Sequence, residues 1–247
     1  MKRAILRYVS LGIDVEPDCP PYLATQYRGV TDGLPKLLDV LDASGVRTTC
    51  FCTGQVAERF PQCIHDIVAR GHELACHGHT HRPFDGLTEA EARDEIETSS
   101  SVLRSFGPSV TSFRAPNLRF PERYLPLLEC AGFRVDSSAA KYKRRRDAGT
   151  VTTTLARFPA STTSSVLRLP AWIRDPWLMT LASPAVLFVH PWECVNLTRE
   201  RLRLDCRFRT GEPALRAISE MIASMQRQGT VFLRMMDLPS LAGHAAA

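Results

Sequence analysis

Features that are missing from the sequence exclude several classes of protein. No run of apolar residues is long enough to cross a bilayer as a helix. The basic start, MKRAILRYVSLGIDVEPD, has neither the apolar segment nor the small-residue cleavage site of a secretory signal. We therefore expect a cytoplasmic protein with no integral membrane segment.

Cysteine spacing and charge give little support to two other common kinds of site. The eight cysteines include no C-x-x-C pair, and most lie in apolar runs, where a free thiol packs as a small hydrophobic group. We expect reduced cysteines that do not bind a metal. The net charge of +5 includes one basic cluster, KYKRRR at 141–146, which is too little for a nucleic-acid-binding surface. No nucleic-acid partner is expected.

No glycine-rich phosphate loop follows the first apolar run, which removes the commonest reason to expect an open α/β sheet. Apolar, β-branched runs alternate instead with helical patterns, which predicts parallel strands joined by right-handed crossovers. About eight strands in 247 residues favour a closed or nearly closed α/β barrel, like a TIM barrel. The expected strands are AILRYVSLGID, VRTTCFCTG, HELACHG, VTSFRAP, FRVDSS, VLRLPAW, AVLFVHPWE and TVFLRMMDL.

Helices are predicted between these strands. Apolar residues recur at helical spacing from Val30 to Leu41, and Gly45 follows at the expected helix C-terminus. Thr88 and Glu91 have the spacing of a capping box at the start of another helix. The polar stretch 147–166 is expected to be a surface excursion. Because there is no linker and no internal repeat, we predict a single domain over residues 1–247.

Titratable or metal-binding side chains follow five of the predicted strands. In a barrel of parallel strands the active site lies at the C-terminal ends of the strands. Hydrophobic packing gives no reason for such groups to collect there, so we predict one active site built from all five segments. They are Asp14-Val15-Glu16-Pro17-Asp18, His77-Gly78-His79-Thr80-His81, Arg114-Ala115-Pro116, Asp136-Ser137-Ser138 and His190-Pro191-Trp192-Glu193.

Three of the seven histidines stand at every second position in the segment HGHTH. Two imidazoles four residues apart on a helical or tightly turned backbone lie on one face, close enough to share a metal ion. His77 and His81 have that spacing, so His79 is expected to point elsewhere. A carboxylate from the first strand would complete a three-ligand site with positions open for water, which is typical of a catalytic zinc.

These ordered motifs resemble those of the NodB-homology polysaccharide deacetylases, metal-dependent amidohydrolases that remove N-acetyl groups from sugars. The resemblance covers residues from about 5 to 238, the expected core of the domain, and leaves a tail at 239–247 that we expect to be disordered. It implies a distorted barrel of seven or eight strands. It also implies a divalent metal, most commonly Zn²⁺, with Co²⁺ and Ni²⁺ as alternatives.

The resemblance assigns roles to the first two motifs. Asp14 corresponds to the catalytic base, and His77 and His81 correspond to metal ligands. Glu16 takes the position of the metal-binding carboxylate, which in the family is usually an aspartate. Because glutamate is one methylene longer than aspartate, Asp18 remains an alternative ligand.

The later motifs complete the expected mechanism. Arg114 corresponds to the residue that orients the base, Asp136 belongs to the motif that forms a wall of the groove, and His190 corresponds to the general acid. The metal would activate water for attack on the amide, with Asp14 taking the proton and His190 protonating the departing amine.

The substrate is less constrained by the sequence. The stretch GIDVEPDCPPYLATQYRGVTDGLPKLL also resembles the branch that includes deformylases of lipid-linked amino sugars, so the acyl group is acetyl or formyl. The 141–146 cluster would favour an anionic substrate, such as a sugar on a nucleotide or lipid diphosphate. We expect a carbohydrate substrate, specifically a cytoplasmic glycan or glycolipid precursor. A ring-opening amidase of the allantoinase-like branch and a non-catalytic sugar-binding relative are the alternatives, and the oligomeric state is left open.

Overall fold

The structure is a computed structural model and describes residues 7–107, 109–143 and 151–244. Eight strands form one sheet in the order β6-β5-β4-β3-β2-β1-β7, with β8 pairing with the start of β1, and all paired strands run parallel. Their bounds are β1 Arg7–Val15, β2 Thr49–Cys52, β3 Glu73–Cys76, β4 Ser112–Phe113, β5 Val135–Asp136, β6 Ala156–Arg157, β7 Ala185–Val189 and β8 Thr230–Phe232.

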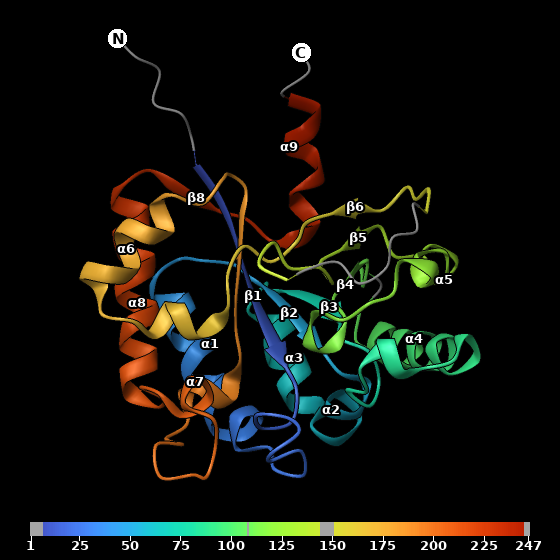
Figure 1. Cartoon of the computed structure of the whole chain (residues 1–247), viewed down its shortest axis with the longest axis horizontal. Helices are drawn as coiled ribbons and strands as arrows, with labels where there is room; N and C mark the ends of the chain where they lie inside the picture. Colours follow the sequence, from blue (N-terminus) through green and yellow to red (C-terminus); the bar gives the residue numbers. More distant parts are fainter. Residues whose placement is uncertain (1–6, 108, 144–150, 245–247) are drawn as a thin grey trace.

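The sheet curls around β1, which crosses the middle of the molecule (Figure 1). The backbone N–H of Ser161, just after β6, donates to the carbonyl of Val186 in β7 at 2.8 Å and so links the two ends of the curled sheet. The predicted distorted barrel of seven to eight parallel strands is therefore confirmed. It is distorted because β4, β5 and β6 are only two residues long each.

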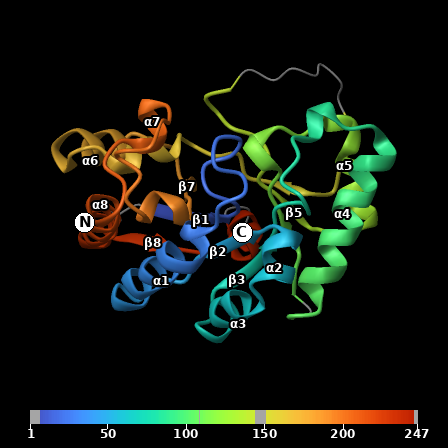
Figure 2. The ribbon, with the colours of Figure 1, turned by 90° about the horizontal axis from the view of Figure 1, so that it is seen from below.

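Helices surround the outside of the curled sheet (Figure 2). They are α1 Leu34–Ala43, α2 Gly54–Arg59, α3 Pro61–Ala69, α4 Glu89–Arg104, α5 Leu125–Cys130, α6 Ala171–Met179, α7 Leu204–Arg207, α8 Glu212–Arg227 and α9 Pro239–His244. Short 3-10 or π turns η1 to η7 span Gly29–Gly33, Phe84–Gly86, Pro116–Leu118, Glu122–Tyr124, Ser164–Arg168, Pro191–Cys194 and Met235–Asp237. None of the helices described is both long and apolar enough to span a bilayer.

Side chains of β1 alternate between two environments. Val9, Leu11 and Ile13 pack in the main hydrophobic core with apolar residues of the surrounding helices. Gly12 and Asp14, on the opposite side of the strand, face the guanidinium of Arg114 inside the barrel. Because both faces are covered, the strand is buried along most of its length, as is usual for parallel sheets.

Local sequence signals explain several helix ends. Thr88 and Glu91 form the predicted capping box of α4, with hydrogen bonds in both directions. Gly45 follows α1 with φ +64°, the left-handed conformation expected after a helix C-terminus. The helix α2 ends at Arg59, and after one intervening residue Pro61 begins α3, in the first helical turn, where proline is tolerated.

Two expectations differ from the structure. The segment VLRLPAW is not a strand; it forms η5 and the start of α6, because Arg168 turns inward to a buried carboxylate and Pro170 precedes the first residue of α6. The strand β6 lies instead within 147–166, which we expected to be a surface excursion.

The C-terminal segment, where we expected disorder, contains α9. Leu241 packs against the cluster of Phe51, Met235 and Leu238. Residues 245–247 and the Arg144–Arg146 part of the basic cluster lie outside the described residues.

Candidate active site

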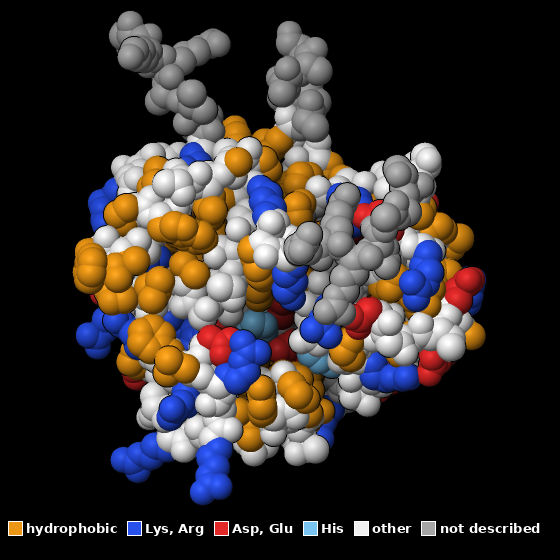
Figure 3. Space-filling view, viewed as in Figure 1, with side chains coloured by type: hydrophobic (Ala, Val, Ile, Leu, Met, Phe, Trp, Pro, Cys, Tyr) orange, Lys and Arg blue, Asp and Glu red, His pale blue; other side chains and the backbone are white. Residues whose placement is uncertain are grey.

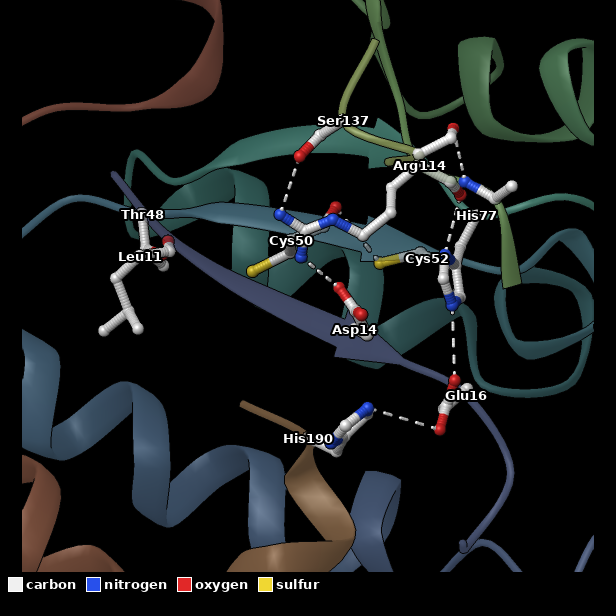
Figure 4. Close-up of polar contacts among 12 residues, drawn as sticks. Leu11, Asp14, Glu16, Thr48, Cys50, Cys52, His77, Arg114, Ser137 and His190 are labelled. Atoms are coloured by element: carbon white, nitrogen blue, oxygen red, sulfur yellow. Dashed lines mark hydrogen bonds and ion pairs between the residues drawn. The ribbon is translucent and has the colours of Figure 1, made fainter. Parts of the chain in front are cut away.

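Glu16, His77 and His81 bring three potential ligand atoms within 4.8 Å of one another, and all three side chains are buried. Glu16 follows the end of β1, and His77 follows the end of β3. Oε2 of Glu16 lies 3.2 Å from Nε2 of His77 and 2.5 Å from Nε2 of His81. Figure 4 shows the Glu16 carboxylate and the His77 ring directed toward each other.

The loop after β3 brings His77 and His81 together by a turn and not by a helix. Gly78 and His81 have φ angles of +74° and +61°, which reverse the chain between the two rings. The buried carboxylate of Glu95 in α4 accepts from the backbone N–H groups of His79 and Thr80 at 2.8 and 2.9 Å. These bonds hold the loop while its two imidazoles converge.

Residues adjacent to the cluster point away from it. Asp18 accepts hydrogen bonds from the backbone N–H groups of Arg28 and Gly29 at 3.0 and 2.7 Å, so its carboxylate caps the turn η1. Burial raises the pKa of Asp18, and these two hydrogen bonds oppose that effect. His79 lies 3.9 Å from Glu58. The geometry therefore places Glu16 with His77 and His81. Asp18 and His79 do not belong to this group.

The three side chains fit a divalent metal ion. Two imidazoles and one carboxylate are a common ligand set for a catalytic zinc. Nε2 of His81 is buried and faces Oε2 of Glu16, the same oxygen that faces Nε2 of His77. Burial would raise the pKa of Glu16, but the charges of His81 and His190 and a hydrogen bond from His77 hold it well below its usual range. A buried, ionised carboxylate between two buried imidazole nitrogens is suited to binding a cation.

Asp14 and Arg114 form a buried pair next to this cluster. Nη1 of Arg114 donates to Oδ1 of Asp14 at 2.7 Å, and Nη2 donates to Ser137 Oγ at 3.1 Å. The guanidinium lies over the Phe51 ring, 4.1 Å from its centroid. Space for it exists because residue 12 is glycine: a Cβ there would lie 2.6 Å from Nη1.

His190 approaches Glu16 from the end of β7 (Figure 4). Its Nε2 lies 3.8 Å from Oε1 of Glu16, and its Nδ1 lies 2.7 Å from Oε1 of Glu193. Burial lowers the pKa of His190, but Glu16 and Glu193 outweigh this effect and raise it to about 9. These carboxylates therefore favour the protonated imidazole, with Nδ1 bound by Glu193 and Nε2 directed to Glu16.

Asp136 lies apart from the other six predicted site residues. Its Oδ2 pairs with Nε of Arg157 at 3.1 Å, and its Oδ1 accepts from the backbone N–H of Ser138. It lines a cavity of about 1150 Å³ at the ends of β4, β5 and β6. The other six, Asp14, Glu16, His77, His81, Arg114 and His190, are brought together.

The structure adds residues around His190 to which no sequence motif assigned a role. Trp192 stacks on the His190 ring at 4.6 Å and donates from Nε1 to Glu16 Oε1 at 3.1 Å. Arg168 pairs through Nε with Oε2 of Glu193 at 2.7 Å, and both groups are fully buried. The segment HPWE placed Trp192 and Glu193 near the site, but nothing in the sequence pointed to Arg168.

Comparisons with known proteins show the family of the chain. The sequence profile of the polysaccharide deacetylase family matches residues 9–135, which include β1, the HGHTH loop and Arg114. A chitooligosaccharide deacetylase of Bradyrhizobium sp. is 38% identical over 84 residues, 33% of this chain and 38% of that protein. The chain spans about a third of the length of the curated relatives that it matches.

Solved structures share the fold at low sequence identity. A Mycobacterium smegmatis protein assigned to the polysaccharide deacetylases has a TM-score of 0.71 and 21% identity, covering 100% of this chain and 93% of that one. A CE4 family pseudoenzyme of Bacillus anthracis has a TM-score of 0.64 and 16% identity, covering 95% and 66%. The fold alone therefore does not establish activity. The family profile covers more than half of the sequence, and on that match the chain belongs to the polysaccharide deacetylase family.

Proposed function

We propose that the protein is a metal-dependent hydrolase that removes an N-acyl group from an amino sugar. The observation that carries the proposal is the convergence of two sets of groups. Glu16, His77 and His81 form a metal-binding cluster, and the Asp14–Arg114 pair and His190 reach it from separate strands (Figure 4). Hydrolysis of an amide needs both an acceptor for a proton from water and a donor to the leaving nitrogen.

The metal would be held by Glu16, His77 and His81, with Zn²⁺ as the first candidate and Co²⁺ or Ni²⁺ as alternatives. Such an ion supplies Lewis-acid polarisation of the amide carbonyl and of the attacking water. The Nδ1–H of His77 donates to the carbonyl of Arg114 at 2.8 Å, which leaves Nε2 with its lone pair toward the cluster.

Asp14 is the proposed base. Arg114 binds only one of its oxygens in a hydrogen bond, at Oδ1, so Oδ2 remains available to accept a proton from water. The buried guanidinium is also the counter-ion of this carboxylate, because a buried charge needs a partner. Arg114 thus orients the base and compensates its charge.

His190 is the proposed acid. An amide nitrogen leaves only when it is protonated, because an amide anion is a very poor leaving group. The protonated imidazole is fixed through Nδ1 by Glu193, so its Nε2–H can point toward the substrate nitrogen. Arg168 holds Glu193 in turn, which keeps the ring in one orientation.

We also propose that the substrate is anionic. The cavity that Asp136 lines is also lined by Arg119, Arg123, Lys141, Lys143 and Arg157 but by only three carboxylates. The pKa of Lys143 is lowered, first by burial and then by the nearby charge of Arg119. A phosphate group on a nucleotide or lipid carrier would relieve this repulsion between cations.

The cytoplasm remains our proposal for the site of action, on a precursor and not on finished polymer. All eight cysteines are free, including seven that are at least partly buried in apolar surroundings. Free thiols are usual in proteins that work in reducing compartments. The acyl group is acetyl or formyl, which the structure leaves open.

The test is acyl release from a panel of amino sugars, with chitooligosaccharides, a nucleotide-linked N-acetylamino sugar and a lipid-phosphate-linked N-formylamino sugar as substrates. Acetate and formate are measured separately, on the zinc-loaded protein and after chelation. Release that depends on the metal and on both Asp14 and His190 supports the proposal. Ring opening of a cyclic ureide without any acyl release would favour the allantoinase-like alternative, and sugar binding without turnover would favour the non-catalytic one.

A further inference from the structure

One face of the molecule combines exposed apolar side chains with a surplus of arginines. Trp172 in α6 is 78% exposed and Leu204 in α7 is 69% exposed. Neither side chain contributes much to the hydrophobic core. Ile173, Trp177 and Tyr22 are also exposed. We call these five side chains, together with the arginines of residues 198–209, the apolar–basic face. Its arginines are Arg199, Arg201, Arg203, Arg207 and Arg209.

The segments that carry this face lie side by side. Arg168, at the end of η5 and just before α6, donates to the carbonyls of Asp205 and Phe208 and so holds α7 beside η5. Leu23 and Leu202 pack in one small cluster, which places the loop that contains Tyr22 next to the same segment. Figures 1 and 2 both show α6 and α7 on one side of the molecule.

The charge of the face is positive. Residues 198–209 contain five arginines and two carboxylates, a formal charge of +3. Asp205 is bound by Arg203 at 2.8 Å, and Glu200 lies 3.8 Å from Arg28. No carboxylate of the described chain pairs with Arg199, Arg201 or Arg209. In Figure 3, groups of hydrophobic side chains lie on the left of the molecule, with Lys and Arg side chains at the lower left.

We propose that the apolar–basic face binds the surface of a lipid bilayer that contains anionic lipids. Trp side chains favour the interface between water and lipid, and Leu or Ile beside them can insert below the headgroups. Arginines near a bilayer are attracted by anionic headgroups. A second copy of this chain is a poorer partner, because a two-fold contact through the same face would oppose its unpaired arginines to one another.

The position of the face relates it to the site. Figure 3 shows histidine and acidic side chains in a hollow at the centre of the same side of the molecule. A bilayer bound at α6 and α7 would therefore bring lipid headgroups beside the opening of the site. If the proposed function holds, this names the substrate class as an amino sugar anchored to a lipid; the binding itself does not depend on that function.

The test is flotation of the full chain with vesicles, which needs no substrate. Vesicles of phosphatidylcholine alone are compared with vesicles that contain about one third phosphatidylglycerol. We expect binding to the anionic vesicles that falls with added salt. The double variant Trp172→Ala, Leu204→Ser and the triple variant Arg199→Ser, Arg201→Ser, Arg209→Ser should each weaken it by at least about tenfold.

Matched variants outside the apolar–basic face control for general effects of losing a positive charge or an exposed apolar side chain. Lys36, Arg216 and Arg227 lie on α1 and α8, and their replacement by serine removes three charges while leaving the face intact. Val68→Ser removes an exposed apolar side chain from α3. Both controls should bind as the wild type does, with circular dichroism confirming that all variants fold.

Equal flotation with both kinds of vesicle, or equal loss in the control variants, would overturn the proposal. So would a dimer in light scattering that the Trp172→Ala, Leu204→Ser variant abolishes, because the face would then belong to a second copy. Vesicle binding by a protein that releases no acyl group would leave this inference standing and contradict the proposed function instead.

Discussion

The backbone carbonyl of Arg114 accepts a hydrogen bond from Nδ1 of His77 at 2.8 Å, while the guanidinium of the same residue binds Asp14 at 2.7 Å. One residue thus orients a proposed metal ligand and the proposed base. The side chain is fully buried, so its position is fixed by packing as well as by these two contacts. A change that displaces the guanidinium should therefore affect catalysis more than it affects the metal.

Gly12→Ala is expected to make that displacement. The new Cβ would lie 2.6 Å from Nη1 of Arg114, inside van der Waals contact, so the guanidinium must move away from Asp14. We expect acyl release to fall by at least about a hundredfold with the metal retained, and the free energy of unfolding to fall by about 1–3 kcal/mol. Gly86→Ala is the matched control, because a Cβ at Gly86 meets no atom within 4 Å. Wild-type activity in the Gly12 variant would show that the Arg114 position is unimportant.

Asp14→Asn should separate the base from the metal ligands. The amide has nearly the shape of the carboxylate but cannot accept the proton, so turnover should fall by about 10²–10⁴. Asp14 is not among the three proposed metal ligands, so metal content should be unchanged. Both quantities are measured on the same preparation, and loss of the metal would make Asp14 a ligand instead of the base.

Glu193→Gln should change the pH dependence of turnover. Glu16 and Glu193 raise the pKa of His190 to about 9, so removal of the Glu193 charge should lower that pKa. The acid must be protonated to act, and activity is lost as the pH rises through its pKa. The alkaline limb of the pH–rate profile should therefore move to lower pH.

A matched control for this variant is Glu58→Gln, which removes an exposed carboxylate near His79 and should leave the profile unchanged. The buried Arg168 loses its partner in the Glu193 variant, so a lower melting temperature is also expected. An alkaline limb that stays in place in a folded, metal-loaded Glu193 variant would argue against this role of Glu193.

His72 should make stability depend on pH between about 4 and 6.5. Burial, followed by the charge of Arg47, lowers its pKa to about 4, and its Nδ1 accepts from the backbone N–H of Thr48 at 3.2 Å. In this pH range the unfolded chain binds the proton and the folded chain does not, so the free energy of unfolding rises with pH. Denaturant titrations should show a rise of about 2 kcal/mol, allowing for partial screening. His72→Gln, which keeps a hydrogen-bond acceptor, should remove most of this rise in the free energy of unfolding with pH. An unchanged slope would assign the pH dependence to other groups.

The sequence predicted those features of the fold and of the candidate site that depend on patterns within a few residues. Strand alternation indicated the parallel barrel, and Thr88 with Glu91 predicted the start of α4. The HGHTH spacing predicted that His77 and His81, and not His79, would share a site, because a tight turn places residues four apart together. These signals are contained within a few residues of chain.

What the sequence could not show depends on contacts between distant segments. The choice between Glu16 and Asp18 follows from hydrogen bonds of Asp18 to Arg28 and Gly29, which belong to another turn. Arg168 was placed in a strand because it stands among apolar residues, and its pairing with Glu193 appears only in three dimensions. The strand β6 is two residues long, too short for any periodic signal.

Metal content by elemental mass spectrometry tests the proposed metal centre, on the wild type beside Glu16→Ala, Asp18→Ala, His81→Ala and His79→Ala. We predict one zinc-like divalent ion per chain in the wild type, lost in the Glu16 and His81 variants and retained in the Asp18 and His79 variants. A wild type that neither contains nor takes up zinc, cobalt or nickel would contradict the proposed metal centre. So would retention of the ion in the Glu16 variant together with its loss in the Asp18 variant.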